Sequence, residues 1–497
     1  MKHVDELDQL NRKSFIITEP HPERVLQFGE GNFLRAFVDW QIDKMNKLAE
    51  WNTGVVIVQP QPGGLVEKLN VQDGLYTVIL EGIKDGKAMK EHTVVECVTR
   101  GINPYGPEFM EYEALSQKPE LRFIVSNTTE AGIAYTPEDQ LEDRPQKSFP
   151  GKLTAFLYKR FQFFKGDQSK GLVIIPCELI DRNGDALKEI VLKYANQWEL
   201  GAEFIAWLEK ANTFCNSLVD RIVPGYPKDR IHEIQAELGY KDDLVVVGEQ
   251  YHLWVIEGPQ WLKEELPAHL AGLNVLIVDD MAPYRTRKVR ILNGAHTALT
   301  PVAYLYGLDT VGQAVEHKVM GEYIQSLIRE EIIPTLDSPA AELNVYADDV
   351  IERFRNPYVS HYVMSIALNS VSKFKTRNLP SLLQYVAQRK ALPAKIVFSL
   401  ASSLVFYRGD RNGESIALAD EAEVLSTFGE LWSTYDGSLA GAKQLTEQVL
   451  SKQTWWGQDL NQIEGLAEQT AQHVYEITSR GMKETLDSLT GNSVPGA

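Results

Sequence analysis

The spacing of hydrophobic residues changes near residue 282, and this change divides the chain into two parts. In the first part, short runs of consecutive apolar residues alternate with longer segments of helical periodicity. That alternation is typical of parallel strands that are buried on both faces and joined by helices. It predicts an α/β Rossmann-like domain with a mostly parallel sheet over residues 1–282. The clearest strand candidates are residues 24–28, 55–58, 121–125, 171–175 and 274–278.

From residue 283 to the end, nearly every stretch repeats its apolar residues at the spacing of an amphipathic helix. This pattern predicts an all-α C-terminal domain over residues 283–497. Clefts between domains are common places for small-molecule sites. We therefore expect substrate and cofactor to meet at the junction of the two domains.

A glycine turn follows the first predicted strand. Residues 24–28 lead into Gly29-Glu30-Gly31, and a helical pattern begins just after it. Strand, glycine turn and helix together expose backbone N–H groups and a helix N-terminus to a pyrophosphate. Leu34 replaces the third glycine of the usual motif. Residues 59–61, Gln-Pro-Gln, stand where an acid would receive the ribose of NAD, so this position leaves NAD and NADP open.

The segment from Lys288 to His296 contains the strongest candidates for catalytic residues. In an α-helix, Lys288, Asn293 and His296 would share one side, which would combine an amine, an amide and an imidazole. Proton transfer beside a carbonyl needs such groups. An ordinary amphipathic helix would explain the same pattern, and Asn293-Gly294 is also a hairpin signal. The position of the segment, where the sheet pattern gives way to helices, favours a functional role.

Composition narrows the classes of function. The net charge of −18 argues against nucleic acid or an anionic membrane as the main partner, since both require a basic surface. Three cysteines without a CxxC spacing, a charged N-terminus and the lack of an 18-residue apolar run predict a soluble, cytoplasmic protein. The ten histidines show no metal-ligand spacing, so no metal is assigned. The glycine turn also lacks the Gly-Lys-Ser/Thr ending of a P-loop.

Four segments together resemble a known family. They are residues 27–40, residues 126–132, the Lys-x4-Asn-x2-His pattern of 288–296, and residues 406–413. Over most of its length the chain resembles the polyol-specific long-chain dehydrogenases, the mannitol dehydrogenase family. The resemblance implies metal-independent hydride transfer with NAD. Within the family, the closer likeness is to members that act on sugar acids, which implies interconversion of D-tagaturonate and D-altronate in hexuronate catabolism.

The resemblance also implies roles for individual residues. Lys288 would be the acid/base, Asn293 would hold the oxyanion, and His296 completes the catalytic set. The pKa of such a lysine must fall toward neutrality, and Arg285, Arg287 and Arg290 are near enough in sequence to contribute. The residues expected to bind cofactor are Val25, Leu26, Gln27, Phe28, Gly29, Glu30, Gly31, Asn32, Phe33, Leu34, Arg35, Ala36, Ser126, Thr128 and Glu130. Those expected to bind substrate are Asn183, Asp220, Lys373 and Arg408.

Two departures from the family pattern concern the substrate site. Mannitol dehydrogenases carry Cys-Asp-Asn where this chain has Cys-Glu-Leu at residues 177–179, so the second oxyanion amide must come from elsewhere, for example from Asn183. The family's Arg-x7-Lys pair becomes Ser365 and Lys373. A carboxylate on the substrate could explain such moved cations, and Lys373, Arg408 and Arg411 are the candidates to bind it.

Other functions remain open from the sequence. A fructuronate reductase or a neutral-polyol dehydrogenase of the same family would share these motifs. A non-catalytic NAD(H)-binding protein that responds to redox state would need only the glycine turn, so the Lys, Asn and His pattern speaks against it. The oligomeric state is not indicated by the sequence.

Overall fold

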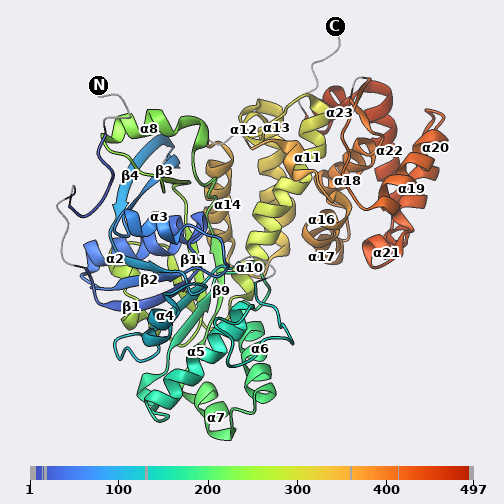
Figure 1. The fold of residues 1–497 in the computed structure, drawn as a ribbon. Helices are drawn as coiled ribbons and strands as arrows, with labels where there is room; N and C mark the ends of the chain where they lie inside the picture. The colour runs from blue at the N-terminus through green and yellow to red at the C-terminus, as the bar shows by residue number, and fades with distance from the viewer. Residues whose placement is uncertain are drawn as a thin grey trace. The chain divides into compact units, whose positions relative to one another are not determined.

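A computed structural model describes residues 7–13, 15, 20–84, 86–128, 132–358, 361–411 and 413–491 (Figure 1). The chain forms two compact units. Unit 1 comprises residues 1–82 and 89–281, and unit 2 comprises residues 83–88 and 282–497. That residues 1–282 bind the cofactor and residues 283–497 carry catalysis stays a prediction.

Unit 1 alternates strands and helices. Its strands are β1 (Glu23–Phe28), β2 (Gly54–Val58), β3 (Tyr76–Lys84), β4 (Lys87–Val95), β5 (Val98–Ile102), β6 (Phe123–Ser126), β7 (Val173–Pro176), β8 (Thr213–Phe214), β9 (Asn216–Asp220), β10 (Val246–Gly248), β11 (Leu253–Glu257) and β12 (Val275–Val278), with the tip of β3 and β4 counted in unit 2. Its helices are α1 (Asn32–Leu34), η2 (Arg35–Asp39), α2 (Trp40–Ala49), α3 (Val66–Val71), α4 (Phe109–Leu115), α5 (Phe149–Phe163), η3 (Gln168–Lys170), α6 (Asn183–Gln197), α7 (Ala202–Ala211), η4 (Lys228–Arg230), α8 (Ile231–Leu238), α9 (Leu262–Glu265) and η5 (Ala268–Ala271).

The central sheet of unit 1 is parallel. Among the described residues it has six strands in the order β5-β2-β1-β6-β7-β8, and each neighbouring pair runs parallel. In chain order of these six strands this is 3-2-1-4-5-6, the order of doubly wound dinucleotide-binding folds. The strand order reverses between β1 and β6. In such folds the ligand crevice lies beyond the carboxyl ends of the strands at this reversal.

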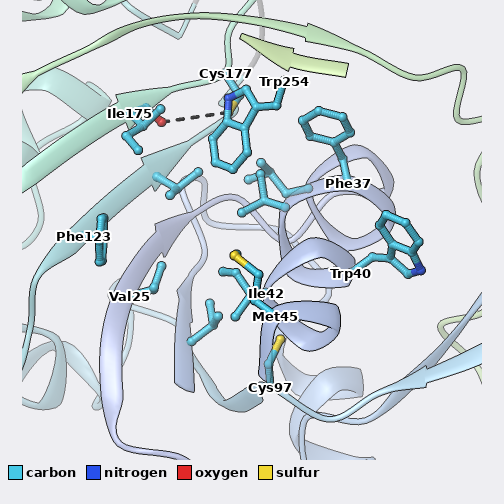
Figure 2. Close-up of a cluster of buried hydrophobic side chains, with 14 of the residues drawn as sticks. Val25, Phe37, Trp40, Ile42, Met45, Cys97, Phe123, Ile175, Cys177 and Trp254 are labelled. Carbon is cyan, nitrogen blue, oxygen red and sulfur yellow. Dashed lines mark hydrogen bonds between the residues drawn. The ribbon is translucent and has the colours of Figure 1, made fainter. Parts of the chain in front are cut away.

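Apolar side chains cover both faces of the sheet, as the continuous apolar runs predict. On one face Val25, Phe123 and Ile175 pack with Trp40 and Met45 of α2 (Figure 2). On the other face, alternate strand residues such as Leu26 and Ile124 pack against residues of α4, α5 and α6. Successive strand side chains point to opposite faces, so two apolar cores require strands without a polar side.

Two smaller sheets complete unit 1. One has the order β10-β3-β4, and the other has the order β12-β11-β9. In the second, β11 runs parallel to β12 and antiparallel to β9. The sequence predicted strands at 75–81 and 92–98, whereas β3 and β4 lie at 76–84 and 87–95. The exposed residues of β4 hide the alternation that would mark its start.

Apart from the tip of β3 and β4, the described residues of unit 2 form helices, their connecting segments and one short hairpin. Its helices are α10 (Ala282–Arg287), η6 (Lys288–Asn293), α11 (Gly294–Tyr306), α12 (Val311–Glu316), α13 (Lys318–Ser326), η7 (Leu327–Ile332), η8 (Ile333–Thr335), α14 (Ala340–Phe354), α15 (Val363–Ile366), α16 (Ser370–Arg377), α17 (Leu379–Arg389), α18 (Ala394–Phe406), α19 (Ala422–Ser433), α20 (Leu439–Leu450), α21 (Gln453–Trp456), η9 (Leu460–Gln462), α22 (Leu466–Arg480) and α23 (Met482–Leu489). The two-residue strands β13 (Asp410–Arg411) and β14 (Glu414–Ser415) correct the prediction that this half is wholly helical.

The core of unit 2 is built around α11 and α18. Both helices are buried on every side over most of their length, and they pack on each other. A helix that is apolar all round is stable only inside such a core. Gly294 lies within the helical run, with φ −63° and ψ −45°, so the hairpin interpretation of Asn293-Gly294 is wrong. Among the described residues, none of the helices combines the length and apolar character needed to cross a bilayer.

Candidate active site

The glycine turn lies at the reversal point of the parallel sheet. Gly29 follows β1 and has φ +121°, and a Cβ there would lie 2.9 Å from the carbonyl oxygen of Asn127, which follows β6. Only glycine fits that position without strain. Gly31 is the N-cap of α1, and a Cβ built on it meets nothing within 4 Å. The turn therefore leaves open space in front of a helix N-terminus, which suits a phosphate group.

Most predicted cofactor residues point into the protein. Val25, Leu26 and Phe28 belong to the sheet cores, and Gln27 donates to Gly29 O and to Asp39. They could meet a cofactor only through their backbone. Glu30, Gly31, Asn32 and Phe33 are partly or fully exposed, Leu34 and Ala36 are buried, and Glu130 lies outside the described residues.

Arg35 is a buried cation that braces the turn. It donates to Glu30 O at 3.1 Å, to Asn32 Oδ1 at 2.8 Å and to Leu244 O. Its guanidinium also lies over the ring of Tyr76. Burial lowers its pKa. Because these contacts use its donors, Arg35 supports the turn, and its predicted contact with a cofactor stays a prediction.

A buried carboxylate ties together the ends of β6 and β7. Glu178 accepts hydrogen bonds from the Ser126 hydroxyl and from the backbone N–H and hydroxyl of Thr128, each at 3.0 Å. Burial raises the pKa of Glu178, and these hydrogen bonds oppose the shift. The hydroxyl groups of Ser126 and Thr128, both predicted to bind the cofactor, thus donate to Glu178. Glu178 takes the place of an acid in the family pattern, and its bracing role was not foreseen from the sequence.

Asn183, the predicted source of the missing oxyanion amide, is hydrogen-bonded within the protein. Its side chain is fully buried. The amide N–H groups donate to the carbonyls of Pro176, Glu178 and Ser217, each at 3.0 Å. The amide oxygen accepts from the backbone of Gly184 and Ser217. Because the side-chain N–H groups of Asn183 all donate to carbonyls of the protein, they argue against the predicted contact with the substrate.

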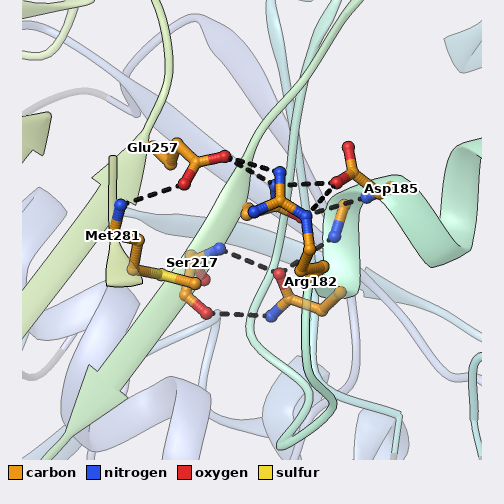
Figure 3. A network of polar contacts seen from close by, with 8 residues as sticks. Arg182, Asp185, Ser217, Glu257 and Met281 are labelled. Atoms are coloured by element: carbon orange, nitrogen blue, oxygen red, sulfur yellow. Dashed lines mark hydrogen bonds and ion pairs between the residues drawn. The ribbon is translucent and has the colours of Figure 1, made fainter. Parts of the chain in front are cut away.

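The surroundings of Asn183 explain why it is buried. Next to it, Arg182 pairs with Asp185 and with Glu257, and Glu257 accepts the N–H of Met281 at 2.9 Å (Figure 3). This network fastens the start of α6 to β11. Asp220, the other substrate residue predicted in unit 1, is buried at the end of β9, and its role stays a prediction.

The loop after β2 carries no outward acid. Gln59 is buried and donates to the carbonyls of Gln61 and Pro62 within the same loop. A carboxylate nevertheless reaches this loop from the glycine turn, since a Cβ built on Gly64 would lie 2.2 Å from Oε1 of Glu30. Burial raises the pKa of Glu30, and the backbone N–H of Leu65 opposes that shift.

The predicted catalytic residues lie in one helical run that changes its pitch. The segments α10, η6 and α11 are consecutive, and η6 is a π-helix in which Gly294 N–H donates to Val289 O, five residues back. In an α-helix, the five-residue step from Lys288 to Asn293 would rotate the side chain by about 140°. The wider π turn instead brings residues five apart nearly above one another. The two half-buried side chains therefore share a face more closely than the assumed α-helix predicted.

His296 lies one turn after Asn293 and is buried, with 7% of its surface exposed. Its ring stacks on Phe354 at 4.3 Å and meets the ring of His361 edge-on at 4.9 Å. Nε2 has no hydrogen-bond partner among the described residues. Burial lowers the pKa of His296 well below its usual value, and the nearby side chains of His361, Arg353, Arg377 and Lys373 lower it further. The imidazole is therefore neutral and keeps one ring nitrogen for a ligand.

The cations predicted to bind the substrate are bonded to other groups of the protein. Arg408 pairs with Asp410 at 2.5 and 3.0 Å, and Arg411 pairs with Asp309 at 2.9 Å. Because each of these guanidinium groups is already paired with an aspartate, the structure argues against a role for Arg408 or Arg411 in binding a substrate carboxylate. Lys373 donates to Ile366 O at 2.7 Å and is close enough to His296 to affect its pKa.

Arg377 was not among the site residues predicted from the sequence. Its Nη1 donates at 3.1 Å to the hydroxyl of Thr297, which directly follows the predicted catalytic residue His296. Arg377 stands four residues after Lys373 in α16, and that spacing places both on one side of the helix. The Arg-x7-Lys spacing of the family points to position 365, upstream of Lys373, where this chain has serine. The i, i+4 spacing of a helix points downstream of Lys373 to Arg377 instead.

Two family models match the two parts of the chain. The mannitol dehydrogenase Rossmann domain matches residues 23–269, and the mannitol dehydrogenase C-terminal domain matches residues 280–478. The chain belongs to the mannitol dehydrogenase family. Curated members of this family that are similar to the chain include an altronate oxidoreductase of Bacillus subtilis (strain 168), 53% identical over 97% of this chain and 98% of that protein. Another, from Cronobacter sakazakii, is 49% identical over 94% of this chain and 97% of that protein.

Two solved structures show the same fold. A substrate-free D-sorbitol dehydrogenase gives a TM-score of 0.77 at 22% identity, covering 96% of this chain and all of the other. The Pseudomonas fluorescens mannitol 2-dehydrogenase, in ternary complex with NAD and D-mannitol, gives 0.65 at 19% identity, covering 98% and 100%. The predicted fold class and the predicted family are confirmed. Among the described residues, no group of three His, Cys, Asp or Glu side chains is arranged to hold a metal.

Proposed function

We propose that this mannitol dehydrogenase family member is an NAD-dependent altronate oxidoreductase, which interconverts D-tagaturonate and D-altronate in hexuronate catabolism. The observation that carries the proposal is the run from Lys288 to His296, where a π turn aligns an amine with an amide ahead of a buried, neutral imidazole. The near full-length likeness to altronate oxidoreductases supports the substrate. We also propose a cytoplasmic location, in keeping with three buried cysteines that form no disulfide.

The cofactor proposed is NAD. Gly29 and Gly31 leave room for a pyrophosphate at the N-terminus of the first helix. Residues 59–67 contain no lysine or arginine that could pair with the 2′-phosphate of NADP. The carboxylate of Glu30 beside Gly64 would instead suit the free ribose hydroxyls of NAD. Glu30 in the turn thus takes the place of the acid that usually ends the second strand.

The reaction needs three actions from this chain. NADH, when bound, supplies the hydride that reduces the ketone carbon of tagaturonate. The amide N–H of Asn293 donates to the ketone oxygen as negative charge develops there, and the Lys288 ammonium gives that oxygen a proton. The free Nε2 of His296 orients the substrate through a neighbouring hydroxyl. In the oxidative direction Lys288 removes the proton from the alcohol of altronate.

A coupled measurement tests this proposal. Oxidation of NADH and of NADPH is followed at fixed protein concentration with D-tagaturonate, D-fructuronate and D-tagatose in turn. We expect turnover with NADH and tagaturonate, with kcat/KM at least tenfold above the other pairs. A preference for fructuronate would make the chain a fructuronate reductase, and a preference for tagatose would make it a polyol dehydrogenase. Binding of NADH without turnover of any substrate would support the non-catalytic alternative.

A further inference from the structure

Several basic side chains of unit 2 lie near His296, the proposed catalytic histidine. Burial lowers the pKa of His296 most, and His361, Arg353, Arg377 and Lys373 lower it further. They come from α14, α16 and the segment before α15. Among these cations, Arg353 lies near Asp349 and Lys373 near Asp420. For Arg377 and His361, burial alone accounts for the lowered pKa, without an acid.

Arg377 is held beside the residues proposed to react. Asn293, His296 and Thr297 lie at i, i+3 and i+4 on one helical surface. Arg377 donates to the Thr297 hydroxyl, and the adjacent Asn378 donates to Gly294 O at 2.9 Å. These two bonds fix the end of α16 against the catalytic helix. Thr297 is the one hydrogen-bond partner of the Arg377 side chain among the described residues, so most of its five N–H donors remain for a ligand.

The distance along the helix suits a sugar acid. Thr297 lies about one turn, on the order of 5 Å, beyond Asn293. In tagaturonate, three hydroxyl-bearing carbons separate the ketone from the carboxylate, which is a comparable length. A half-buried guanidinium without an acid needs a compensating anion, and its planar fork matches a carboxylate. Between these two positions in sequence, the buried His296 keeps Nε2 without a hydrogen-bond partner among the described residues.

We propose that Arg377 binds the terminal carboxylate of the substrate, with His361 beside it, and thereby selects sugar acids over neutral ketoses. This inference rests on the proposed function, because it assigns the acid end of the same substrate. Arg377 replaces the arginine that the family pattern would place at Ser365. Thr297 orients the guanidinium, and Lys373 adds positive charge from the preceding helical turn.

The test compares a charged and a neutral substrate of the same carbon skeleton. NADH oxidation is measured with D-tagaturonate and with D-tagatose for the wild type, Arg377→Gln, Arg377→Lys and the control Arg389→Gln, an exposed arginine at the end of α17. We expect Arg377→Gln to lower kcat/KM for tagaturonate by about 10²-fold or more, mainly through KM, and to change that for tagatose less than threefold. Arg377→Lys should recover part of the loss, and Arg389→Gln should match the wild type.

A binding measurement keeps the two proposals apart. D-altronate should raise the melting temperature of the wild type with NAD present, and it should not raise that of Arg377→Gln, whose own melting temperature should stay within 2–3 °C of the wild type, about 1 kcal/mol. Equal losses for tagaturonate and tagatose in Arg377→Gln would show a merely structural role and overturn the inference. A wild type that binds altronate but reduces no hexuronate would contradict the proposed function and leave the carboxylate site supported.

Discussion

At the scale of single residues, Lys288 is the group whose removal separates chemistry from binding. Lys288→Ala removes the proposed proton donor and leaves the glycine turn untouched. We expect kcat to fall by about 10²-fold or more while the affinity for NADH, measured by fluorescence titration, stays within about twofold. Lys318→Ala, which removes an exposed lysine at the start of α13, is the matched control. Activity within a few-fold of the wild type would exclude Lys288 as the acid/base.

Asp39 makes a second prediction at this scale, one about stability. It is fully buried. Its Oδ2 accepts from Tyr76 at 2.8 Å and from Gln27 at 3.2 Å, and Oδ1 has no partner among the described residues. Burial raises the pKa of Asp39 to about 7, although these hydrogen bonds and Arg35 oppose the shift. The folded state thus holds this proton more tightly than the unfolded chain does.

The sign of the pH effect follows from that difference. Between the unfolded pKa of about 4 and the folded pKa of about 7, the folded protein binds more protons, so the contribution of Asp39 to stability falls as the pH rises. Above pH 7 the loss is complete. Asp39→Asn, which keeps the acceptor and removes the charge, should flatten this part of the profile. The free energy of unfolding in urea is measured at pH 5 and pH 8 for the wild type and for Asp39→Asn. If its change between the two pH values is the same in both proteins, the assignment to Asp39 is refuted.

At the scale of elements, the strands of the parallel sheet were predictable because they lack a polar face. The runs at 55–58 and 121–125 became β2 and β6 within two residues, and the glycine turn fell where predicted. The π turn at η6 was not predictable, because residues 288–293 have the composition of an ordinary helix. Tertiary contacts set its pitch. The same applies to Asn183 and Arg35, because each also donates to a backbone carbonyl distant in sequence, that of Ser217 and that of Leu244.

The buried helix α18 depends on a cap from another element. The carboxylate of Glu331, in η7, accepts the backbone N–H groups of Lys395 and Ile396 at 2.9 Å. These groups would otherwise be left without partners at the start of a core helix. We expect Glu331→Ala to lower the free energy of unfolding of unit 2 by about 1–3 kcal/mol. Glu330→Ala, which removes only an exposed ion pair with Lys395, should stay within about 1 kcal/mol. Equal effects in urea unfolding would contradict the capping role.

At the scale of the whole molecule, net charge and site charge have opposite signs. The chain carries −18 overall, yet three cations, Arg353, Arg377 and Lys373, are close enough to His296 to lower its pKa. The net charge led to the expectation of no nucleic-acid partner, which stays a prediction, but it could not reveal a local site for an anion. Only tertiary packing brings Arg377 of α16 and His361, from the segment before α15, to His296 of α11, because these residues are separated by up to about 80 positions in the sequence.

Cofactor binding provides the prediction that involves the folded chain as a whole. A ligand that binds only the folded state stabilises it by RT ln(1 + [L]/Kd), or about 2.7 kcal/mol at a hundredfold excess over Kd. NADH should therefore raise the melting temperature in calorimetry in a concentration-dependent manner, and NADPH should do so only at much higher concentration. The difference follows from a loop at 59–67 without a cation and from the carboxylate of Glu30 beside it.

The glycine turn decides whether that stabilisation arises where we propose. A methyl group at Gly31 meets nothing within 4 Å, and the N-cap has φ −67° and ψ 164°, a conformation that alanine adopts. Gly31→Ala should therefore fold normally, apart from the modest cost of alanine as an N-cap, but its methyl group would stand where the pyrophosphate must approach. We expect the stabilisation by NADH to fall by at least half. Gly429→Ala adds a methyl group in equally open space within α19 and should keep the full effect. If both variants retain it, the cofactor does not bind at this turn.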